Sequence, residues 1–265
     1  MAIAAFTFAA GYLALAAALF FAQRSILFQP PLPATLPRPQ QGVLLRLPGP
    51  PAAPEVIATW LPPAAPEGNA VVFFHGNAEQ LTDFEGRGER LHAAGLGVLC
   101  VEYPGYGVSP GAPSRASIVA AAGVALAYLH GPLGVPRERS VLLAHSLGTG
   151  VAAELAARGE AARLVLISPY TSIREMATQL APFLPVSLLV RDRFDTAALA
   201  PSLRLPVLIV HGSDDEVIPS WMGRRLAQLI PGARLLWIEG GMHNDLFAAH
   251  GGTLWPALLE FAGNF

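Results

Sequence analysis

The sequence predicts an α/β domain, in which helices flank a mostly parallel sheet of eight strands, preceded by an apolar N-terminal helix. The main observation is that short, nearly continuous apolar runs alternate with helical patterns. Such runs are typical of strands that are buried on both faces of a parallel sheet. The second observation is the composition. With 52% hydrophobic and 14% charged residues, the 265-residue chain can bury one large core, and a disordered chain is excluded.

The N-terminal stretch differs in kind from the rest. Residues 2–23 carry no charge, and Arg24 closes the stretch. A helix of that length spans about 33 Å at 1.5 Å per residue, which is enough for a hydrocarbon core of about 30 Å. We therefore expect an uncleaved single-span membrane anchor over residues 1–24; a cleaved signal peptide and a buried or surface helix are the alternatives. Three arginines follow the span: Arg24, Arg38 and Arg46. By the positive-inside rule they favour a cytoplasmic position for the C-terminal domain, but they do not determine the orientation.

A proline-rich connector over residues 25–42 separates this helix from the expected domain, residues 43–265. Its prolines exclude a helix or a central strand. Eight apolar runs are expected as strands, the first two antiparallel: 43–48, 56–62, 70–77, 96–104, 140–146, 163–169, 206–212 and 233–241. The main helical patterns follow some of these runs: 116–130, 151–159, 222–230 and 253–263. Residues 170–201 are expected to form a short cap that helps to bind an acyl chain, the alternative being a plain surface connection.

The stretch VLLAHSLGTG, residues 141–150, places a serine where an apolar strand gives way to a helix. Small residues near Ser146 allow a tight turn that lifts the serine Oγ clear of the sheet, as in a nucleophile elbow. The usual pattern is G-x-S-x-G, and Ala144 stands here in place of the first glycine. The stretch therefore predicts Ser146 as a nucleophile.

An acid and a histidine follow this serine at later strand ends, in the chain order nucleophile, acid, base. The carboxyl ends of parallel strands share one edge of the sheet, where ligands bind. We expect His243 as the base in preference to His250, because His243 follows the last strand on a loop that can reach the serine. The acid is Asp214 or Asp215, and the residues alone leave that choice open.

This set of residue types is suited to acyl transfer. A serine hydroxyl becomes nucleophilic when an imidazole takes its proton, and an aspartate holds that imidazole in the required tautomer. The oxyanion that forms needs backbone N–H donors, each lowering the barrier by about 3 kcal/mol. We expect one donor from Leu147, directly after the serine, and one from Asn77, in the loop after the apolar run 70–74. Tyr106 and Tyr170 follow two further strand ends, and we expect them to contact the substrate.

From Gln23 to its end, the chain resembles the membrane-anchored branch of the α/β-hydrolase fold family, which includes serine esterases, lysophospholipase-like enzymes and protein depalmitoylating thioesterases. The motifs that carry the resemblance are QRSILFQP, FFHGNAE, VEYPGYGVSPG, AHSLGTG, SPYTSI, PVLIVHGSDDEVIP and GGMHNDL. The resemblance implies the α/β-hydrolase fold, places the acid at Asp215 and places the oxyanion loop at His75-Gly76-Asn77. Ala144 and Met242 depart from the small residues usual at their positions, and neither departure removes a catalytic group.

These observations predict a membrane-anchored serine hydrolase that cleaves carboxylic ester or thioester bonds of lipophilic acyl substrates through an acyl-enzyme on Ser146. An amidase or peptidase with the same triad and a non-catalytic scaffold are the alternatives. No cofactor is implied. Because His75, His145 and His211 lie at separate strand ends, with no carboxylate at a metal-ligand spacing, we expect no metal site. A formal charge of −2 without a basic stripe predicts no nucleic-acid partner.

Overall fold

The computed structural model describes residues 1–38 and 42–263 and contains one sheet of eight strands. The strands are β1 (Val43–Pro48), β2 (Glu55–Leu61), β3 (Ala70–Phe74), β4 (Gly97–Val101), β5 (Ser140–His145), β6 (Arg163–Ile167), β7 (Val207–Gly212) and β8 (Arg234–Ile238). Their order is β1-β2-β4-β3-β5-β6-β7-β8; β2 pairs antiparallel with β1 and β4, and the other pairs are parallel. The expected mostly parallel sheet with an antiparallel start is confirmed.

The helices account for most of the remaining chain. They are α1 (Ala2–Leu27), α2 (Leu81–Ala93), α3 (Arg115–His130), α4 (Gly148–Ala157), α5 (Ile173–Leu180), α6 (Val186–Leu189), α7 (Thr196–Leu199), α8 (Trp221–Leu229) and α9 (Gly251–Gly263), with short 3-10 turns at Arg137–Arg139 and Ala200–Ser202. All four expected helical patterns are helices. Helix α2 is an addition that the sequence patterns did not predict.

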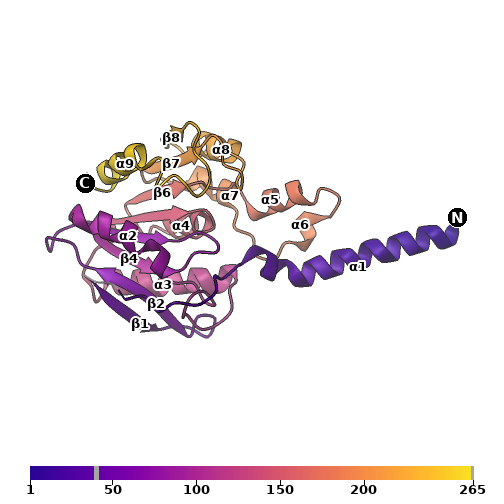
Figure 1. Cartoon of the computed structure of the whole chain (residues 1–265), viewed down its shortest axis with the longest axis horizontal. Coiled ribbons are helices and arrows are strands. Elements are labelled where there is room, and N and C mark those ends of the chain that lie inside the picture. Colours follow the sequence, from indigo (N-terminus) through magenta and orange to yellow (C-terminus); the bar gives the residue numbers. More distant parts are fainter. Residues whose placement is uncertain (39–41, 264–265) are drawn as a thin grey trace.

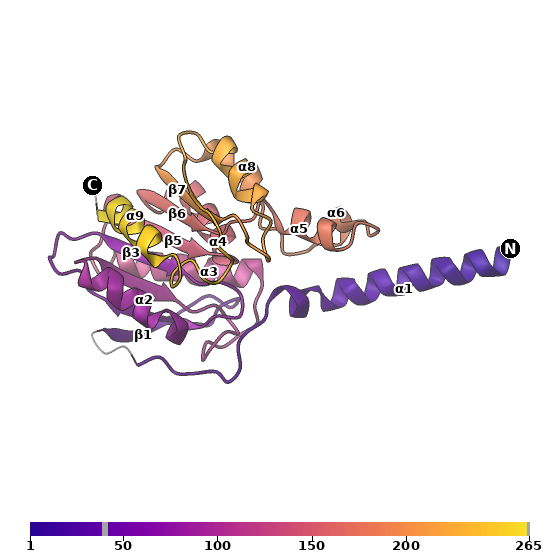
Figure 2. The same cartoon turned by 45° about the horizontal axis from the view of Figure 1, so that its top comes forward.

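The sheet is covered on both faces, which explains why its central strands β3, β4 and β5 are buried along their whole length. In β5, Leu142 and Ala144 pack into the layer that contains α3, α4 and α8. Val141 and Leu143 pack into the opposite layer, which contains α2 and α9. This three-layer arrangement (Figures 1 and 2) leaves only the strand ends and the loops free to carry a site.

Helix α1 extends away from the domain (Figure 1). By length and composition it can cross a membrane or serve as a signal sequence: its most apolar stretch has a mean hydropathy of 2.0, and only 6% of that stretch is buried. The helix ends at Leu27, so residues 25–27, expected in the connector, are helical instead. Residues 39–41 of the expected connector and the last two residues of the expected domain, 264–265, lie outside the described residues.

The expected cap segment, residues 170–201, contains α5, α6 and α7. Figures 1 and 2 both show α5 and α6 on the same side of the domain as α1, beyond the sheet. The cap therefore lies next to the end of α1 that joins the domain.

Candidate active site

The turn after β5 has the geometry of a nucleophile elbow. Strand β5 ends at His145, Ser146 has a φ of +51°, and α4 begins at Gly148. A left-handed backbone costs a non-glycine residue free energy and is held only by its surroundings. Here the surroundings are tight, since a Cβ on Gly148 would lie 2.3 Å from the carbonyl oxygen of Phe74. The turn presents the Ser146 side chain at the carboxyl edge of the sheet.

Gly148→Ala is expected to destabilise the protein by about 3 kcal/mol, because the added methyl group forces the elbow and β3 apart. Gly123→Ala is the matched control: nothing lies within 4 Å of a Cβ added at this position in α3. It should instead stabilise the protein by up to about 1 kcal/mol, because alanine favours a helix. Thermal unfolding of both variants checks this. Equal melting temperatures would contradict the tight fit of the elbow.

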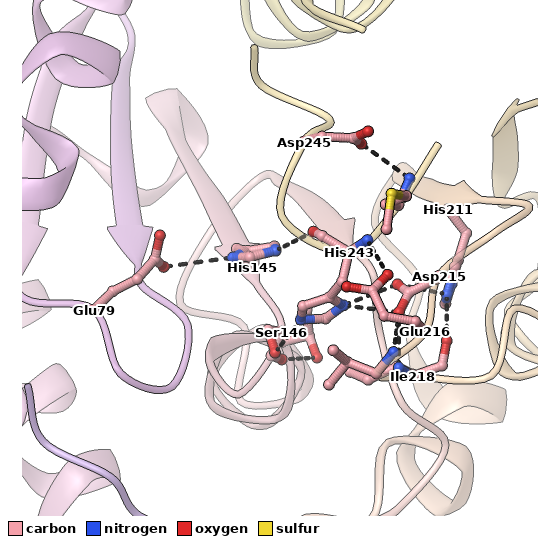
Figure 3. Close-up of polar contacts among 12 residues, drawn as sticks. Glu79, His145, Ser146, His211, Asp215, Glu216, Ile218, His243 and Asp245 are labelled. Carbon is pink, nitrogen blue, oxygen red and sulfur yellow. Dashed lines mark hydrogen bonds and ion pairs between the residues drawn. The ribbon is translucent and has the colours of Figure 1, made fainter. Parts of the chain in front are cut away.

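Three side chains from separate loops meet at this turn (Figure 3). The Oγ of Ser146 lies 2.9 Å from Nε2 of His243, and Nδ1 of His243 lies 2.9 Å from each carboxylate oxygen of Asp215. Because a carboxylate only accepts hydrogen bonds, Nδ1 carries the proton it donates, and in the neutral ring Nε2 is free to accept the serine proton. The arrangement can move a proton from Ser146 to His243.

The carboxylate of Asp215 is fixed from several directions. Its side chain has no exposed surface, and its Oδ1 accepts hydrogen bonds from the backbone N–H groups of Val217, at 3.0 Å, and Ile218, at 2.7 Å. Burial alone would raise the pKa of this carboxyl, but the hydrogen bonds from His211 and His243 outweigh it and hold the pKa well below its ordinary value. Asp215 is therefore ionised throughout the neutral range.

The two competing candidates from the sequence lie elsewhere. Asp214 accepts a hydrogen bond from the Ser213 hydroxyl at 2.7 Å, and His250 lies 3.8 Å from Asp245. The structure thus brings His243 and Asp215, and neither alternative, to Ser146.

A second polar network, which the sequence did not predict, supports the site from the side of α2 (Figure 3). Glu79 accepts a hydrogen bond from the backbone N–H of Gly76 at 2.6 Å and pairs with Arg87 at 2.8 Å and with Nδ1 of His145 at 3.4 Å. The other ring nitrogen of His145 lies 3.2 Å from the backbone oxygen of His243. Glu79 therefore connects the loop after β3, the residue before the nucleophile and the histidine loop.

Glu79→Gln is expected to lower the free energy of unfolding at pH 7 by about 1 to 3 kcal/mol, because it leaves buried donors without a charged acceptor. Burial would raise the pKa of Glu79, but the hydrogen bond and charge of His145 and the charge of Arg87 hold it well below 4.5. The folded state thus favours the ionised form. The stabilisation is fully present at pH values above the pKa that Glu79 has in the unfolded protein. It is lost as the pH falls through the pKa that Glu79 has in the folded protein.

Melting temperatures measured between pH 7 and pH 3 check this expectation. The difference between wild type and Glu79→Gln should be largest at neutral pH and shrink below about pH 4.5. Glu138→Gln, on an exposed side chain, is the control and should show little difference at any pH. A constant difference between wild type and Glu79→Gln across this range would show that the charge of Glu79 has no stabilising role.

Ser146 opens into an apolar cavity of about 550 Å³, within the range of about 300 to 1,000 Å³ usual for ligand sites. Its walls come from α1, the cap and the loops around the elbow. The lining residues are Leu19, Phe20, Gln23, Ile26, Leu27, Asn77, Ser146, Leu147, Tyr170, Ile173, Met176, Ala177, Leu180, Ala181, Leu184, Val186, Leu189, Val190, Val217 and Ile218. None of these residues is charged, so the cavity suits an aliphatic ligand.

The remaining residues singled out in the sequence lie around this cavity in different ways. Asn77, Leu147 and Tyr170 line it, and the Tyr170 hydroxyl donates to the Leu147 carbonyl oxygen at 3.1 Å. Tyr106 is fully buried outside the lining, and its hydroxyl donates to Oδ1 of Asn77 at 2.7 Å. Tyr106 therefore contacts Asn77 and is not part of the cavity lining, and the substrate contact expected of it stays a prediction.

Comparisons with known proteins agree with this architecture. The family model Hydrolase_4, described as serine aminopeptidase, S33, matches residues 65–198. The uncharacterized protein Rv2307c of Mycobacterium tuberculosis is 34% identical over 195 residues, which are 73% of this chain and 69% of that protein. The human alpha/beta hydrolase domain-containing protein 17C is 33% identical over 181 residues, and the match covers 66% of this chain and 53% of the human protein.

Solved structures show the same fold at low sequence identity. The Pyrococcus furiosus esterase Pf2001 has a TM-score of 0.72 at 14% identity and covers 88% of this chain and 97% of its own. The Paleococcus ferrophilus monoacylglycerol lipase has a TM-score of 0.61 at 23% identity. The match covers 78% of this chain and 98% of the lipase chain. The fold is thus that of the α/β-hydrolases. The chain belongs to the α/β-hydrolase family and is a hydrolase with an esterase-like fold.

Proposed function

We propose that this protein is a serine hydrolase that cleaves carboxylic ester or thioester bonds of lipophilic acyl substrates through an acyl-enzyme on Ser146. The observation that carries the proposal is the hydrogen-bonded series Ser146–His243–Asp215, which opens into an uncharged apolar cavity. The series supplies a nucleophile, a base and an orienting acid. The cavity supplies a binding site for an acyl chain.

In the first half of the reaction, His243 takes the proton of Ser146 while Oγ attacks the acyl carbon. The oxyanion receives hydrogen bonds from backbone N–H groups, which we assign to Leu147 and Asn77, both at the cavity wall. As the intermediate collapses, the ester C–O or thioester C–S bond breaks, and the imidazolium gives its proton to the leaving alcohol or thiol. In the second half, His243 activates a water molecule that releases the carboxylic acid and restores the serine.

In this proposal, helix α1 anchors the protein in a membrane. Its apolar length and low burial support that assignment. An anchor places the cavity close to lipid, where lipophilic esters and thioesters are concentrated. Membrane lipids and acylated molecules are therefore the expected partners, and no cofactor is required by the chemistry.

An amidase or peptidase with the same triad is the second candidate, favoured by the serine aminopeptidase description of the matching family model. An aminopeptidase must recognise a charged α-amino group, for which an acidic side chain is the natural partner. The residues that line the cavity include no acid among the described part of the chain. The lining therefore favours the ester and thioester proposal.

A matched substrate panel separates these functions. Chromogenic esters, acyl thioesters and aminoacyl anilides with acyl chains of two to sixteen carbons are offered to the purified full-length protein in detergent. The proposal predicts kcat/KM values for long-chain esters or thioesters at least a hundredfold above those for the anilides. A preference for aminoacyl anilides would contradict the esterase proposal and favour an amidase or peptidase. If folded protein turned over none of these substrates, a non-catalytic scaffold would be favoured.

A further inference from the structure

One face of α1 lines the cavity. Leu19, Gln23 and Ile26 are spaced by four and three residues, and Phe20 and Leu27 are spaced by seven, so all five fall on one side of the helix. They lie on the last two to three turns, next to the domain. A helix that served only as an anchor would leave this face to lipid.

Polar contacts fasten the same turns to the cap. The side-chain amide of Gln23 donates to the backbone oxygen of Leu189 at 3.1 Å and accepts from the backbone N–H of Arg191 at 2.8 Å. Arg24 pairs with Asp192 at 2.8 Å, and the Asp192 side chain is only 5% exposed. A carboxylate buried to that extent needs its partner, so Arg24 is part of the packed structure and not a free surface charge.

The contact between helix and cap is extended. The hydroxyl of Tyr12 donates to the backbone oxygen of Phe183 at 2.9 Å. Tyr12 and Gln23 are eleven residues apart, which corresponds to about 16 Å along a helix. The cap therefore contacts α1 at two places separated by that distance, and Figures 1 and 2 show α5 and α6 on the same side of the domain as α1.

A third set of contacts fastens the end of α1 to the loop after β3. The side-chain N–H of Asn77 donates to the backbone oxygen of Leu27 at 2.8 Å, and its Oδ1 accepts from the backbone N–H of Gln29 at 2.9 Å. Asn77 also lines the cavity. The end of the helix is thus held between the cap and the loop that carries Asn77.

We propose that the C-terminal turns of α1 form one wall of the acyl-binding cavity and set the length of acyl chain that the protein accepts. The substrate chain lies between α1 and the cap, so the apolar helix is a specificity-determining part of the hydrolase as well as its anchor. This inference rests on the serine hydrolase function proposed above.

Leu19→Trp tests the proposal, since it adds bulk from the α1 side of the cavity. Leu13→Trp is the matched control: the same change on the same helix, at a side chain that is 66% exposed and does not line the cavity. For each full-length protein in the same detergent, kcat/KM is measured for a C4 and a C16 ester on one preparation. The ratio of the two values does not depend on the fraction of protein that folds. Ile26→Trp is a second variant on the cavity face.

The C16-to-C4 ratio is expected to fall at least tenfold in Leu19→Trp and Ile26→Trp and to keep its wild-type value in Leu13→Trp. Ratios equal to wild type in both cavity variants would overturn the proposal. Binding of a fluorescent C16 fatty acid, measured for the same proteins, needs no catalysis and should weaken at least tenfold in the cavity variants alone. Wild-type protein that binds this probe but hydrolyses no ester would contradict the hydrolase function. In that case, the comparison of fatty-acid binding between the cavity variants and Leu13→Trp would still test whether α1 forms a wall of the cavity.

Discussion

Ser146→Ala is expected to lower kcat for the best ester or thioester by at least about 10⁴-fold, because it removes the hydroxyl on which the proposed acyl-enzyme forms. The hydroxyl lies 2.9 Å from the base at the tip of a strained turn, and that turn is held by glycine packing, not by the serine side chain. The variant should therefore fold normally. Initial rates and a thermal melt on the same preparation check both halves of the expectation.

The melt is the control that separates chemistry from folding. A variant with wild-type melting behaviour and lost activity supports Ser146 as the nucleophile. Activity within tenfold of wild type in a folded Ser146→Ala protein would contradict the acyl-enzyme mechanism, since positioning and oxyanion binding alone leave only a small residual rate.

Asp215→Asn is expected to reduce kcat by about 10⁴-fold, the second largest effect. An amide can turn its NH₂ group toward Nδ1 of His243, which then becomes the acceptor and leaves the proton on Nε2. In that tautomer the ring cannot take the proton of Ser146. Because asparagine has the same shape as aspartate and keeps an oxygen for the N–H groups of Val217 and Ile218, the loop should remain in place.

Asp214→Asn is the matched control, one residue away. Its carboxylate contacts the Ser213 hydroxyl and makes no contact with His243. We expect its kcat to stay within about threefold of wild type, as is usual for a substitution outside the reacting groups. Similar losses in both variants would show that the charge of the loop, and not the geometry at Nδ1, is what matters.

The sheet could be predicted from the sequence because burial on both faces gives the central strands nearly continuous apolar runs. Val141 to Ala144 are all apolar, since alternate residues face opposite helical layers. Ser146 could be predicted for a similar reason, because a serine between small residues at the end of an apolar strand is typical of a nucleophile elbow. Both signals depend on a few neighbouring residues, which the sequence shows directly.

Helix α2 had no such local signal. Its thirteen residues are mostly polar and include two glycines, which disfavour a helix. The helix is stabilised by tertiary contacts instead, through burial of Leu81, Phe84 and Leu91. A reciprocal pair of hydrogen bonds between Gln80 and Asp83 closes its first turn, and this pattern begins with a residue that rarely caps helices.

The choice between two adjacent aspartates depends on the backbone of the loop after β7, which the residue types alone do not determine. The N–H groups of Val217 and Ile218 turn back onto Asp215 and direct its carboxylate toward His243. The role of Glu79 depends on contacts with residues 66 positions away, at His145. The cavity wall formed by α1 depends on contacts more than 160 residues apart in the chain, such as that of Gln23 with Leu189.

The most direct test of the proposed acyl-enzyme chemistry is to map the site of a covalent fluorophosphonate adduct. The full-length protein is labelled, digested and sequenced by tandem mass spectrometry, so that no natural substrate has to be guessed. We expect one adduct, on Ser146, whose formation is lost in His243→Ala and strongly slowed in Asp215→Asn but not in Asp214→Asn. An adduct on another residue, or folded wild-type protein that takes no label, would contradict it.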